Sequence, residues 1–316
     1  MTHLRMNAPG NFCAGCSERD NAHLRNRKRI EILMDAPDLD ISLLDPESTA
    51  EMVRLINMDR FTTQAMGEPL AGLPDPSIFH SILDLACGPG GWVLDVAFAH
   101  PEIDVAGVDI SNLMIRYANA RAASQEIHNA SFGVMDITQP LDFSDNTFDL
   151  VNARFLVGVL QRDKWPALIS ECTRILRPGG ILRLTEPVNL GFTTSPALEE
   201  WNARIFQLIK RAGYGFSPTG RSYGMAPVLP RFLRQEGYRD IQHFAHVVEF
   251  SAGTPGWSDF YHQTEIAYQA GKSMFVQAGM ATQEEADEMY QQVISELMAE
   301  DFGHMWHYQT VQGVKP

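Results

Sequence analysis

The fold of this chain of 316 residues is decided by the stretch Ile82-Leu83-Asp84-Leu85-Ala86-Cys87-Gly88-Pro89-Gly90-Gly91-Trp92. Its first residues have the apolar pattern of a strand, interrupted only by Asp84, and they lead into a turn rich in glycine. Residues 92–100 follow with the pattern of a helix. Gly88 and Gly90 permit positive φ and a close approach of the backbone to a ligand, because no Cβ intervenes. A strand, such a turn and a helix start are typical of a nucleotide-type site at the carboxyl edge of a parallel sheet.

A second acidic position strengthens this interpretation. Asp109 follows Val105-Ala106-Gly107-Val108, the next strand-like run along the chain. A carboxylate at the end of that strand can accept hydrogen bonds from both hydroxyls of a ribose. The two strand ends together therefore predict a site for a cofactor that contains a ribose.

Further blocks of sequence follow the glycine turn. They are Gly107-Val108-Asp109-Ile110-Ser111, Met135-Asp136-Ile137, Phe148-Asp149-Leu150-Val151-Asn152-Ala153-Arg154-Phe155 and Leu176-Arg177-Pro178-Gly179-Gly180. With the turn itself, in which Ala86 stands where a first glycine is usual, these blocks resemble the class I S-adenosylmethionine-dependent methyltransferases in order and spacing. The resemblance covers roughly residues 80–186, and the set is far more specific than any one block.

The resemblance implies S-adenosyl-L-methionine as cofactor and assigns residues to it. Asp109 is expected to accept from both ribose hydroxyls, and Asp136 from the adenine amine beside an apolar wall of Ile110 and Ile137. Asp84, which precedes the turn, suits the ammonium of the cofactor's amino acid part. The predicted cofactor-binding residues are Asp84, Ala86, Cys87, Gly88, Gly90, Asp109, Ile110, Asp136, Ile137, Arg154 and Phe155.

A dehydrogenase is the competing interpretation of the glycine turn. Such an enzyme requires Gly-x-Gly-x-x-Gly, with an acidic residue further along the chain on the ribose. Here the third glycine, Gly91, directly follows Gly90, and Asp84 precedes the turn. This arrangement favours a methyltransferase.

The alternation of strand and helix patterns over residues 80–186 predicts an α/β fold. We expect a Rossmann-like seven-stranded mostly parallel sheet with helices on both faces, and a final strand at 305–311 that inserts antiparallel, as the resemblance implies. Residues 1–70 are predicted to form an N-terminal arm and cap helix, and residues 71–316 the methyltransferase domain. Helical lid insertions are expected at 187–225 and 253–303, with a pocket lined by aromatic residues, namely Trp201, Tyr223, Trp257 and Tyr261.

The N-terminal residues 1–29 are irregular and polar. Cys13 and Cys16 with His23 suggest zinc, but a structural site needs four ligands and no second pair follows. No metal is therefore predicted, and the basic run Arg25–Arg29 is interpreted as a solvated face. Asp45 and Pro46 are interpreted as the start of the cap helix.

The amino-acid composition limits the kinds of partner that this chain is expected to bind. The formal charge is −14, and this chain lacks the basic track that a nucleic-acid partner would require. No run of eighteen apolar residues and no secretory signal are present, so we expect no membrane span and a cytoplasmic location. Four cysteines are compatible with a reducing compartment. A homodimer is possible on these data.

The predicted activity is methyl transfer to carbon or oxygen of a hydrophobic small-molecule metabolite, similar to the quinone-biosynthesis and natural-product methyltransferases. Glu186 is the predicted catalytic residue, because it ends a central strand where open α/β sheets place their chemistry. Its alternative role is to bind backbone amides of the neighbouring loop. His262, His304 and His307 are further candidates for a base. A non-catalytic cofactor-binding protein, acting in regulation or assembly, is the alternative function, and an enzyme acting on protein or RNA is a third.

Overall fold

The computed structural model describes residues 47–316, which belong to one compact unit. The zinc alternative at Cys13, Cys16 and His23, the basic run Arg25–Arg29 and the helix start at Asp45 lie outside the described residues. Within residues 47–316, no helix combines the length and the hydropathy needed to cross a bilayer.

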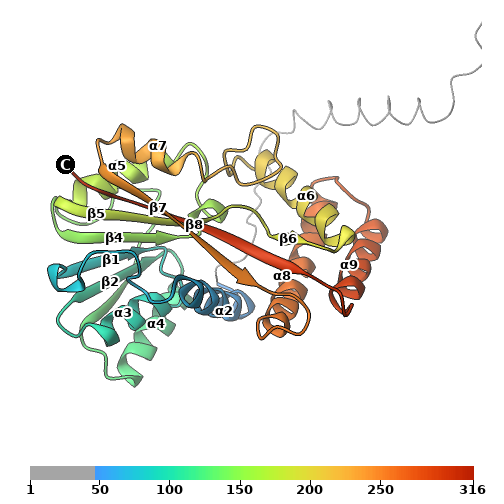
Figure 1. Ribbon diagram of the computed structural model, residues 1–316, viewed down its shortest axis with the longest axis horizontal. Coiled ribbons are helices and arrows are strands. Elements are labelled where there is room, and N and C mark those ends of the chain that lie inside the picture. Colours follow the sequence, from blue (N-terminus) through green and yellow to red (C-terminus); the bar gives the residue numbers. More distant parts are fainter. Residues whose placement is uncertain (1–46) are drawn as a thin grey trace, which may run out of the picture. The chain divides into compact units, whose positions relative to one another are not determined.

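A mixed sheet of eight strands forms the centre of this unit (Figure 1), in the order β3-β2-β1-β4-β5-β8-β6, with β7 on the other side of β8. Strands β1 to β5 run parallel to their neighbours, whereas β8 is antiparallel to β5, β6 and β7. The strands are β1 (Ser81–Leu85), β2 (Asp104–Asp109), β3 (Ala130–Val134), β4 (Phe148–Arg154), β5 (Leu176–Pro187), β6 (Phe192–Thr193), β7 (Arg239–Glu249) and β8 (His304–Val314).

The predicted Rossmann-like, mostly parallel sheet is confirmed, including the antiparallel final strand. The described part of the chain contributes eight strands to the sheet, whereas the sequence predicts seven. The additional strand is β6, whose two residues Phe192 and Thr193 pair with Met305 and His304. Strand β8 extends beyond the end of β5, and β6 satisfies backbone groups that this extension would leave unpaired. Two residues are too few to show the alternation by which a strand is predicted.

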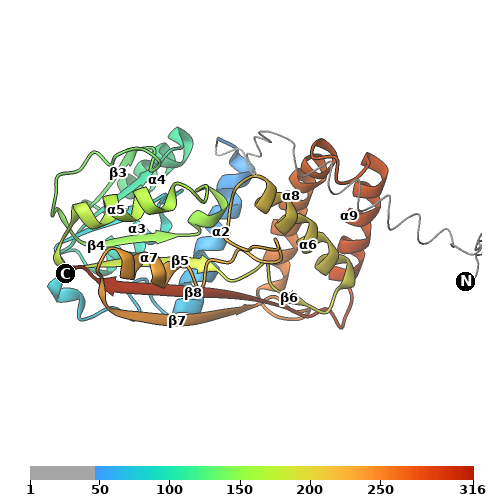
Figure 2. The ribbon, with the colours of Figure 1, turned by 90° about the horizontal axis from the view of Figure 1, so that it is seen from above.

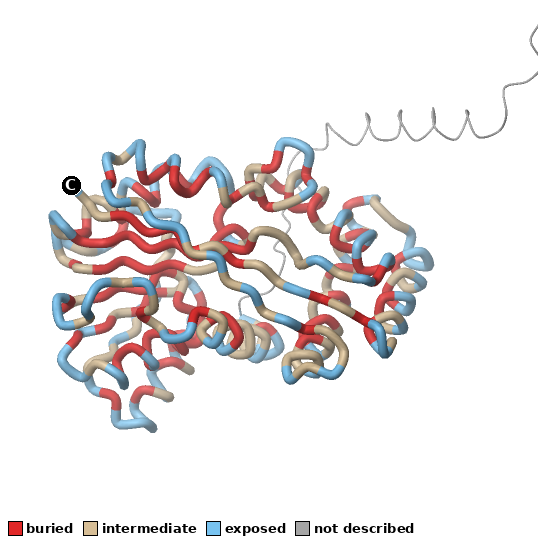
Figure 3. Tube along the Cα trace, in the orientation of Figure 1, coloured by how far each residue is buried: buried red, intermediate tan, exposed pale blue. Residues whose placement is uncertain are grey.

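Helices cover both faces of the sheet (Figures 1 and 3). Successive strand residues point to opposite faces, so Ile82 and Leu150 pack with α3 and α4, while Leu83 and Val151 pack with α5 and α7. The helices are α2 (Thr49–Met66), α3 (Gly91–Ala99), α4 (Asn112–Ser124), α5 (Trp165–Ile175), α6 (Pro196–Arg211), α7 (Leu229–Gln235), α8 (Trp257–Gln277) and α9 (Gln283–Leu297), with the short 3₁₀ helices η2 (Pro76–Ile78) and η3 (Leu156–Gly158).

Side chains cap the starts of helices α4 and α9. The Ser111 hydroxyl accepts from the amide of Met114 at the start of α4, and Thr282 with Glu285 forms a capping box at the start of α9. Helix α5 begins at Trp165 without a side-chain cap.

Helices α6, α8 and α9 belong to the two insertions and pack on one another, beyond the end of the parallel strands (Figure 2). Strands β7 and β8 are long enough to reach them. Trp201 of α6 is buried and stacks on Tyr268 of α8, with ring centroids 4.3 Å apart. Helix α2 contacts α3, β7 and α8, so it bridges the sheet and this helical group.

Candidate cofactor and active site

The glycine turn adopts the left-handed backbone that its sequence predicts. Gly88 has φ 54° and Gly90 has φ 77°, and a Cβ on Gly90 would come within 2.8 Å of Ala118. Ala86 also has positive φ, 52°, a conformation that costs a non-glycine residue about 1 kcal/mol or more. The buried Cys87 donates its backbone amide to Val108 (2.9 Å), which ties the turn to β2, and burial raises the pKa of its thiol.

Asp109 is held in place by backbone amides at the end of β2. One carboxylate oxygen accepts from Gly88 (2.9 Å) and the other from Ser111 (2.9 Å). Burial raises the pKa of this carboxyl, and the two backbone bonds oppose that rise. Each oxygen keeps a further lone pair, so the carboxylate can still accept from two ligand hydroxyls.

Asp84 lies at the end of β1, beneath the turn. It is buried and accepts from the side-chain amide of Asn152 on β4 at 2.7 Å. Burial raises the pKa of Asp84 to about 6, against the attraction of Arg154. Asn152 was missed as a site residue, although its place beside Asp84 follows from the register of the two parallel strands.

Arg154 ends β4, and its positive charge attracts the Asp84 carboxylate. It donates to Asp59 of α2 at 2.7 Å and lies over the ring of Trp92, 5.9 Å from its centroid. Burial would lower the pKa of the guanidinium, but the carboxylates of Asp59 and Asp84 outweigh it and raise that pKa. Its Nε is buried and has no hydrogen-bond partner within the described residues.

Helix α2 lies directly over the turn. A Cβ on Gly88 would be 3.6 Å from Leu55, and one on Gly91 would overlap the carboxylate of Asp59. Thr63 lies one turn further along and donates to Asp59 at 3.4 Å. Sequence reasoning missed Asp59 and Thr63, although their spacing of four from Leu55 places all three on one helix face.

The side expected to hold adenine is more open. Ile110 is 60% exposed, and Asp136 accepts from the amide of Thr138 at 2.8 Å with one oxygen only. Within residues 47–316, the other oxygen of Asp136 accepts no hydrogen bond and could accept from an amine. Ile137 is partly buried beside it and packs against the core.

Glu186 is buried at the end of β5, and its carboxylate caps η3. One oxygen accepts from the amide of Leu156 (2.8 Å) and the other from that of Val157 (3.1 Å). Burial raises the pKa of Glu186 to about 8, and these two bonds limit the rise. The geometry is that of the alternative role, in which Glu186 fixes the loop after β4, and a catalytic role remains a prediction.

Phe155 stands at the start of that loop. It has φ 62° and donates its amide to Thr185 (2.9 Å), and its ring meets Tyr308 of β8 edge-on at 5.2 Å. The ends of β4, β5 and the first part of β8 therefore converge at this edge of the sheet.

The aromatic residues predicted to line a pocket mainly fill the insertions. Trp201 packs between α6 and α8, Tyr223 is buried against Phe206, and Trp257 donates to the carbonyl of Leu297. These contacts pack the helices and loops of the insertions against each other. Of the candidate bases, His262 is exposed and His304 is buried.

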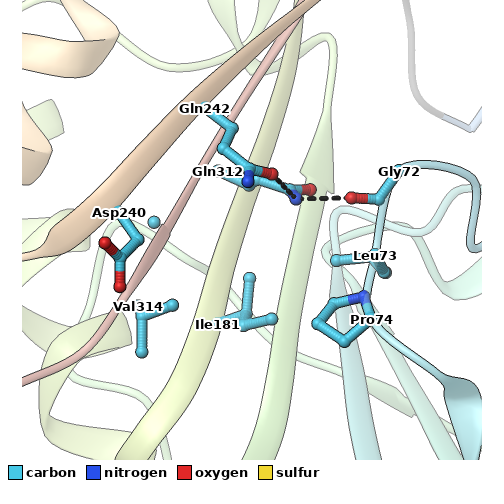
Figure 4. Close-up of a pocket in the computed structure, with 9 residues that line it drawn as sticks. Gly72, Leu73, Pro74, Ile181, Asp240, Gln242, Gln312 and Val314 are labelled. Atoms are coloured by element: carbon cyan, nitrogen blue, oxygen red, sulfur yellow. Dashed lines mark hydrogen bonds between the residues drawn. The ribbon is translucent and has the colours of Figure 1, made fainter.

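The described residues also line a hollow of about 300 Å³ near the amino ends of the parallel strands (Figure 4). Ile181 and Val314 form its apolar floor, and Gln312 donates both to Gln242 (3.0 Å) and to the carbonyl of Gly72 (2.7 Å). This hollow is at the opposite edge from the glycine turn and is not part of the cofactor site.

Comparisons with known proteins agree with this geometry. A family model described as a methyltransferase domain matches residues 82–180. The methyltransferase pytC of Aspergillus terreus is 27% identical over 245 residues, which cover 67% of this chain and 71% of that protein. A demethylmenaquinone methyltransferase of Listeria monocytogenes is 25% identical over 182 residues, covering 52% of this chain and 73% of that protein.

Two phosphoethanolamine N-methyltransferases are also similar. The third such enzyme of Arabidopsis thaliana is 31% identical over 160 residues, which cover 51% of this chain but only 29% of that protein. The solved structure of the second enzyme of Haemonchus contortus, in complex with S-adenosyl-L-methionine, is 20% identical with a TM-score of 0.45 and covers 84% of this chain and 52% of that chain.

A parallel sheet with a glycine turn and an acidic strand end at its carboxyl edge defines a Rossmann-like protein with a nucleotide-type site. The methyltransferase domain matches this part of the chain, and the relatives are methyltransferases. Residues 82–180 therefore correspond to a methyltransferase domain, and the predicted resemblance to the class I S-adenosylmethionine-dependent methyltransferases is confirmed.

Proposed function

We propose that this enzyme transfers the methyl group of S-adenosyl-L-methionine to a carbon or oxygen atom of a hydrophobic small-molecule metabolite. The observation that carries the proposal is the carboxylate of Asp109. Two backbone amides fix both of its oxygens at the end of β2, beside a glycine turn through which a ligand can approach the backbone.

The residues around the turn fit this cofactor at each of its parts. Asp109 would accept from the ribose hydroxyls, and Asp136 from the adenine amine, with Ile110 against the ring. Arg154, with its unpaired Nε, would bind the carboxylate of the amino acid part, and Asp84 its ammonium. A cation and an anion side by side match a zwitterionic amino acid.

The sulfonium of the bound cofactor supplies an activated methyl group, so the protein has little covalent chemistry to perform. Its residues must orient the acceptor in line and exclude water, effects that together can contribute roughly 7–11 kcal/mol. Glu186 positions the loop after β4 through Leu156 and Val157. Phe155, at the start of that loop, is thereby held at the edge where methyl transfer is proposed.

The insertions 187–225 and 253–303 are proposed to cover the acceptor. Support comes from their helices, which lie beyond the carboxyl ends of the parallel strands, and from α8, which contacts α2. The pytC and demethylmenaquinone relatives cover most of their own length in the match, whereas the phosphoethanolamine relative of Arabidopsis covers 29% of its own. The demethylmenaquinone relative, whose named acceptor is a hydrophobic quinone, supports a hydrophobic acceptor for this chain. A cytoplasmic location and a homodimer stay predictions.

The test is a transfer assay with isotopically labelled S-adenosyl-L-methionine and a metabolite extract, in which methylated products are identified by mass spectrometry. We expect label in one or a few apolar products, and about tenfold less of it with the Asp109→Asn variant when the cofactor is below saturation. Binding of the cofactor without any labelled product would instead support the non-catalytic alternative. Label in protein or RNA would contradict the proposed acceptor class.

A further inference from the structure

We infer that His304, Trp306 and Tyr308, on the part of β8 that extends past β5, form with Gln263 of α8 the seat of an uncharged ring compound that carries carbonyl or hydroxyl oxygens. These four residues are called the β8 seat below. The inference rests on the proposed function, because it gives the acceptor a place and a chemical class.

The seat begins at the proposed site of methyl transfer. Tyr308 pairs with Pro187, the last residue of β5 and the neighbour of Glu186, and its ring contacts Phe155. His304, Trp306 and Tyr308 alternate along the strand and therefore share one face. At about 3.3 Å per residue, they extend over roughly 13 Å from the strand ends towards α8. This length suits a molecule of two or three fused rings.

The polar atoms of the seat are buried without partners. Both ring nitrogens of His304, Nε1 of Trp306, the hydroxyl of Tyr308 and Nε2 of Gln263 have no hydrogen bond within residues 47–316. Tyr308 borders the Thr62 hydroxyl, which donates to the carbonyl of Met58 at 2.7 Å and can still accept from Tyr308, so the unpaired character of the seat rests on His304, Trp306 and Gln263. A buried polar group without a partner costs about 1–3 kcal/mol. Such groups are rare in folded proteins, and a cluster of them on one face indicates a ligand that satisfies them.

The proposed cofactor site also contains buried polar atoms without hydrogen-bond partners among the described residues. Nε of Arg154 and Oδ1 of Asn152 are also buried and unpaired, at the place assigned to the zwitterionic end of the cofactor.

The groups of the seat are mostly donors. Trp306 and the Gln263 amide nitrogen can only donate, and the Tyr308 hydroxyl can do so. Their complement is an oxygen that accepts, as in a carbonyl, an ether or a hydroxyl. An aliphatic hydrocarbon would leave every one of them unsatisfied.

Charge is absent from the seat. Burial lowers the pKa of His304 to about 4, so the imidazole is neutral at physiological pH. The nearby cations are already paired, Arg54 with Glu51 at 2.7 Å and Arg60 with Asp259 at 2.6 Å. Among residues 47–316, the cations beside the seat are therefore already paired and would not be free to bind a phosphate, so the seat favours a neutral acceptor.

The walls of the seat are aromatic. Phe260 stacks on His304 with centroids 4.4 Å apart, and Phe250 meets Trp306 edge-on at 5.9 Å. Phe61 of α2 contacts Phe250 at 5.1 Å from the other side. Flat rings offer stacking surface to a flat acceptor.

Entry requires α2 and α8 to separate. The pair Arg60–Asp259 joins these helices at the surface, with side chains 50% and 35% exposed. Exposed pairs of this kind contribute about 0–1 kcal/mol, so the pair does not prevent opening.

The experiment compares three molecules with one carbon skeleton: 1-tetralone, which has a carbonyl, tetralin, which has none, and 1-aminotetralin, which is a cation. Each is titrated calorimetrically into the full chain, with and without S-adenosylhomocysteine. We expect 1-tetralone to bind about tenfold more tightly than either of the other two. Equal binding of 1-tetralone and tetralin, or no binding of 1-tetralone, would overturn the inference.

Tyr308→Phe and Gln263→Met remove single polar groups and keep the side-chain volume. Each substitution should weaken the binding of 1-tetralone by about threefold to tenfold and leave the binding of tetralin unchanged. The melting temperature separates an unpaired group from a structural one. Tyr308→Phe should keep or raise it, whereas the control Tyr238→Phe, whose hydroxyl is paired with Thr173 at 3.1 Å, should lower it. If the melting temperature of Tyr308→Phe decreases as much as that of Tyr238→Phe, the inference is contradicted.

Titration of S-adenosylhomocysteine in the same samples keeps the two proposals apart. If the wild-type chain does not bind this product, the proposed function fails, whatever tetralone does. If it binds and tetralone does not, only the β8 seat is wrong.

Discussion

Asp59 of α2 accepts a hydrogen bond of 2.7 Å from Arg154 at the end of β4, 95 residues further along the chain. The Arg154 side chain is 9% exposed and that of Asp59 17%, so solvent screens the pair only weakly. The Asp59 carboxylate is thus paired with the Arg154 guanidinium, to which we assign the carboxylate of the cofactor. Helix α2 is held over the glycine turn by a group chemically similar to part of the ligand.

Asp59→Asn should separate stability from binding. Without its charge partner the fold loses about 3–5 kcal/mol, because Arg154 remains buried. Cofactor affinity should be retained or rise, since Arg154 becomes available to the cofactor carboxylate. Differential scanning calorimetry and titration of S-adenosylhomocysteine measure the two effects. A matched control is Asp145→Asn, which breaks an exposed pair with Arg174 and should change neither quantity much. Loss of affinity with Asp59→Asn would show that Asp59 supports the ligand.

Asp109→Asn tests the ribose assignment. The amide cannot accept on both sides, so one bond to Gly88 or Ser111 is lost together with at least one ribose bond. We expect S-adenosyl-L-methionine to bind at least tenfold more weakly, a loss of about 1–3 kcal/mol. Asp104→Asn, at the exposed start of the same strand, should leave affinity unchanged. Unaltered affinity in Asp109→Asn refutes the assignment.

Glu186→Gln should change how stability depends on pH. The pKa of Glu186 rises from its usual 4.5 to about 8 in the folded chain, so the folded state takes up the proton more readily than the unfolded state. Its stabilising effect is therefore complete below pH 4.5 and is lost as pH rises to about 8. The variant does not titrate, so the free energy of unfolding of wild type relative to Glu186→Gln should fall across this window by about 2–5 kcal/mol. A difference that is constant with pH would contradict the raised pKa.

Gly271→Ala tests the packing between α6 and α8. A Cβ at this helical position would lie 2.8 Å from Trp201, so the indole stack must shift. Helix propensity favours alanine by about 1 kcal/mol, but overpacking a buried contact costs about 1–3 kcal/mol, and we expect a lower melting temperature. Gly133→Ala, which has no atom within 4 Å of its new Cβ, is the control and should not lower it. A higher melting temperature for Gly271→Ala would show that helices α6 and α8 adjust freely to the added methyl group.

Much of the cofactor half is predictable from the sequence because its signals are local. The strand, turn and helix around Gly88 and Gly90 have an unambiguous pattern, and the acidic strand ends need only the parallel order to be brought together. The partners contributed by α2 are harder to foresee. Asp59 reaches Arg154 only because α2 packs across the turn, and no local pattern fixes the direction of that helix.

The acceptor half could not be foreseen in the same way. Trp201 and Tyr223 were expected in a pocket because they are aromatic, but large apolar side chains serve equally well to join helices. Conversely, the sequence around Trp306 and Tyr308 predicts only a strand. Their unpaired polar atoms appear only once β8 is placed between β5 and β7, since satisfaction of a hydrogen bond is a property of tertiary structure.

The position of β8 also sets an order of events in time. It is the last described strand along the chain, yet it pairs with β5, and more than a hundred residues separate Pro187 from His304. Closing so long a loop loses chain entropy before any contact compensates for it, so such pairings form late. Strands β1 to β5 and the glycine turn can assemble earlier from nearer segments. During refolding we therefore expect affinity for S-adenosylhomocysteine to appear in an early phase, and affinity for an aromatic ketone only when β8 has docked.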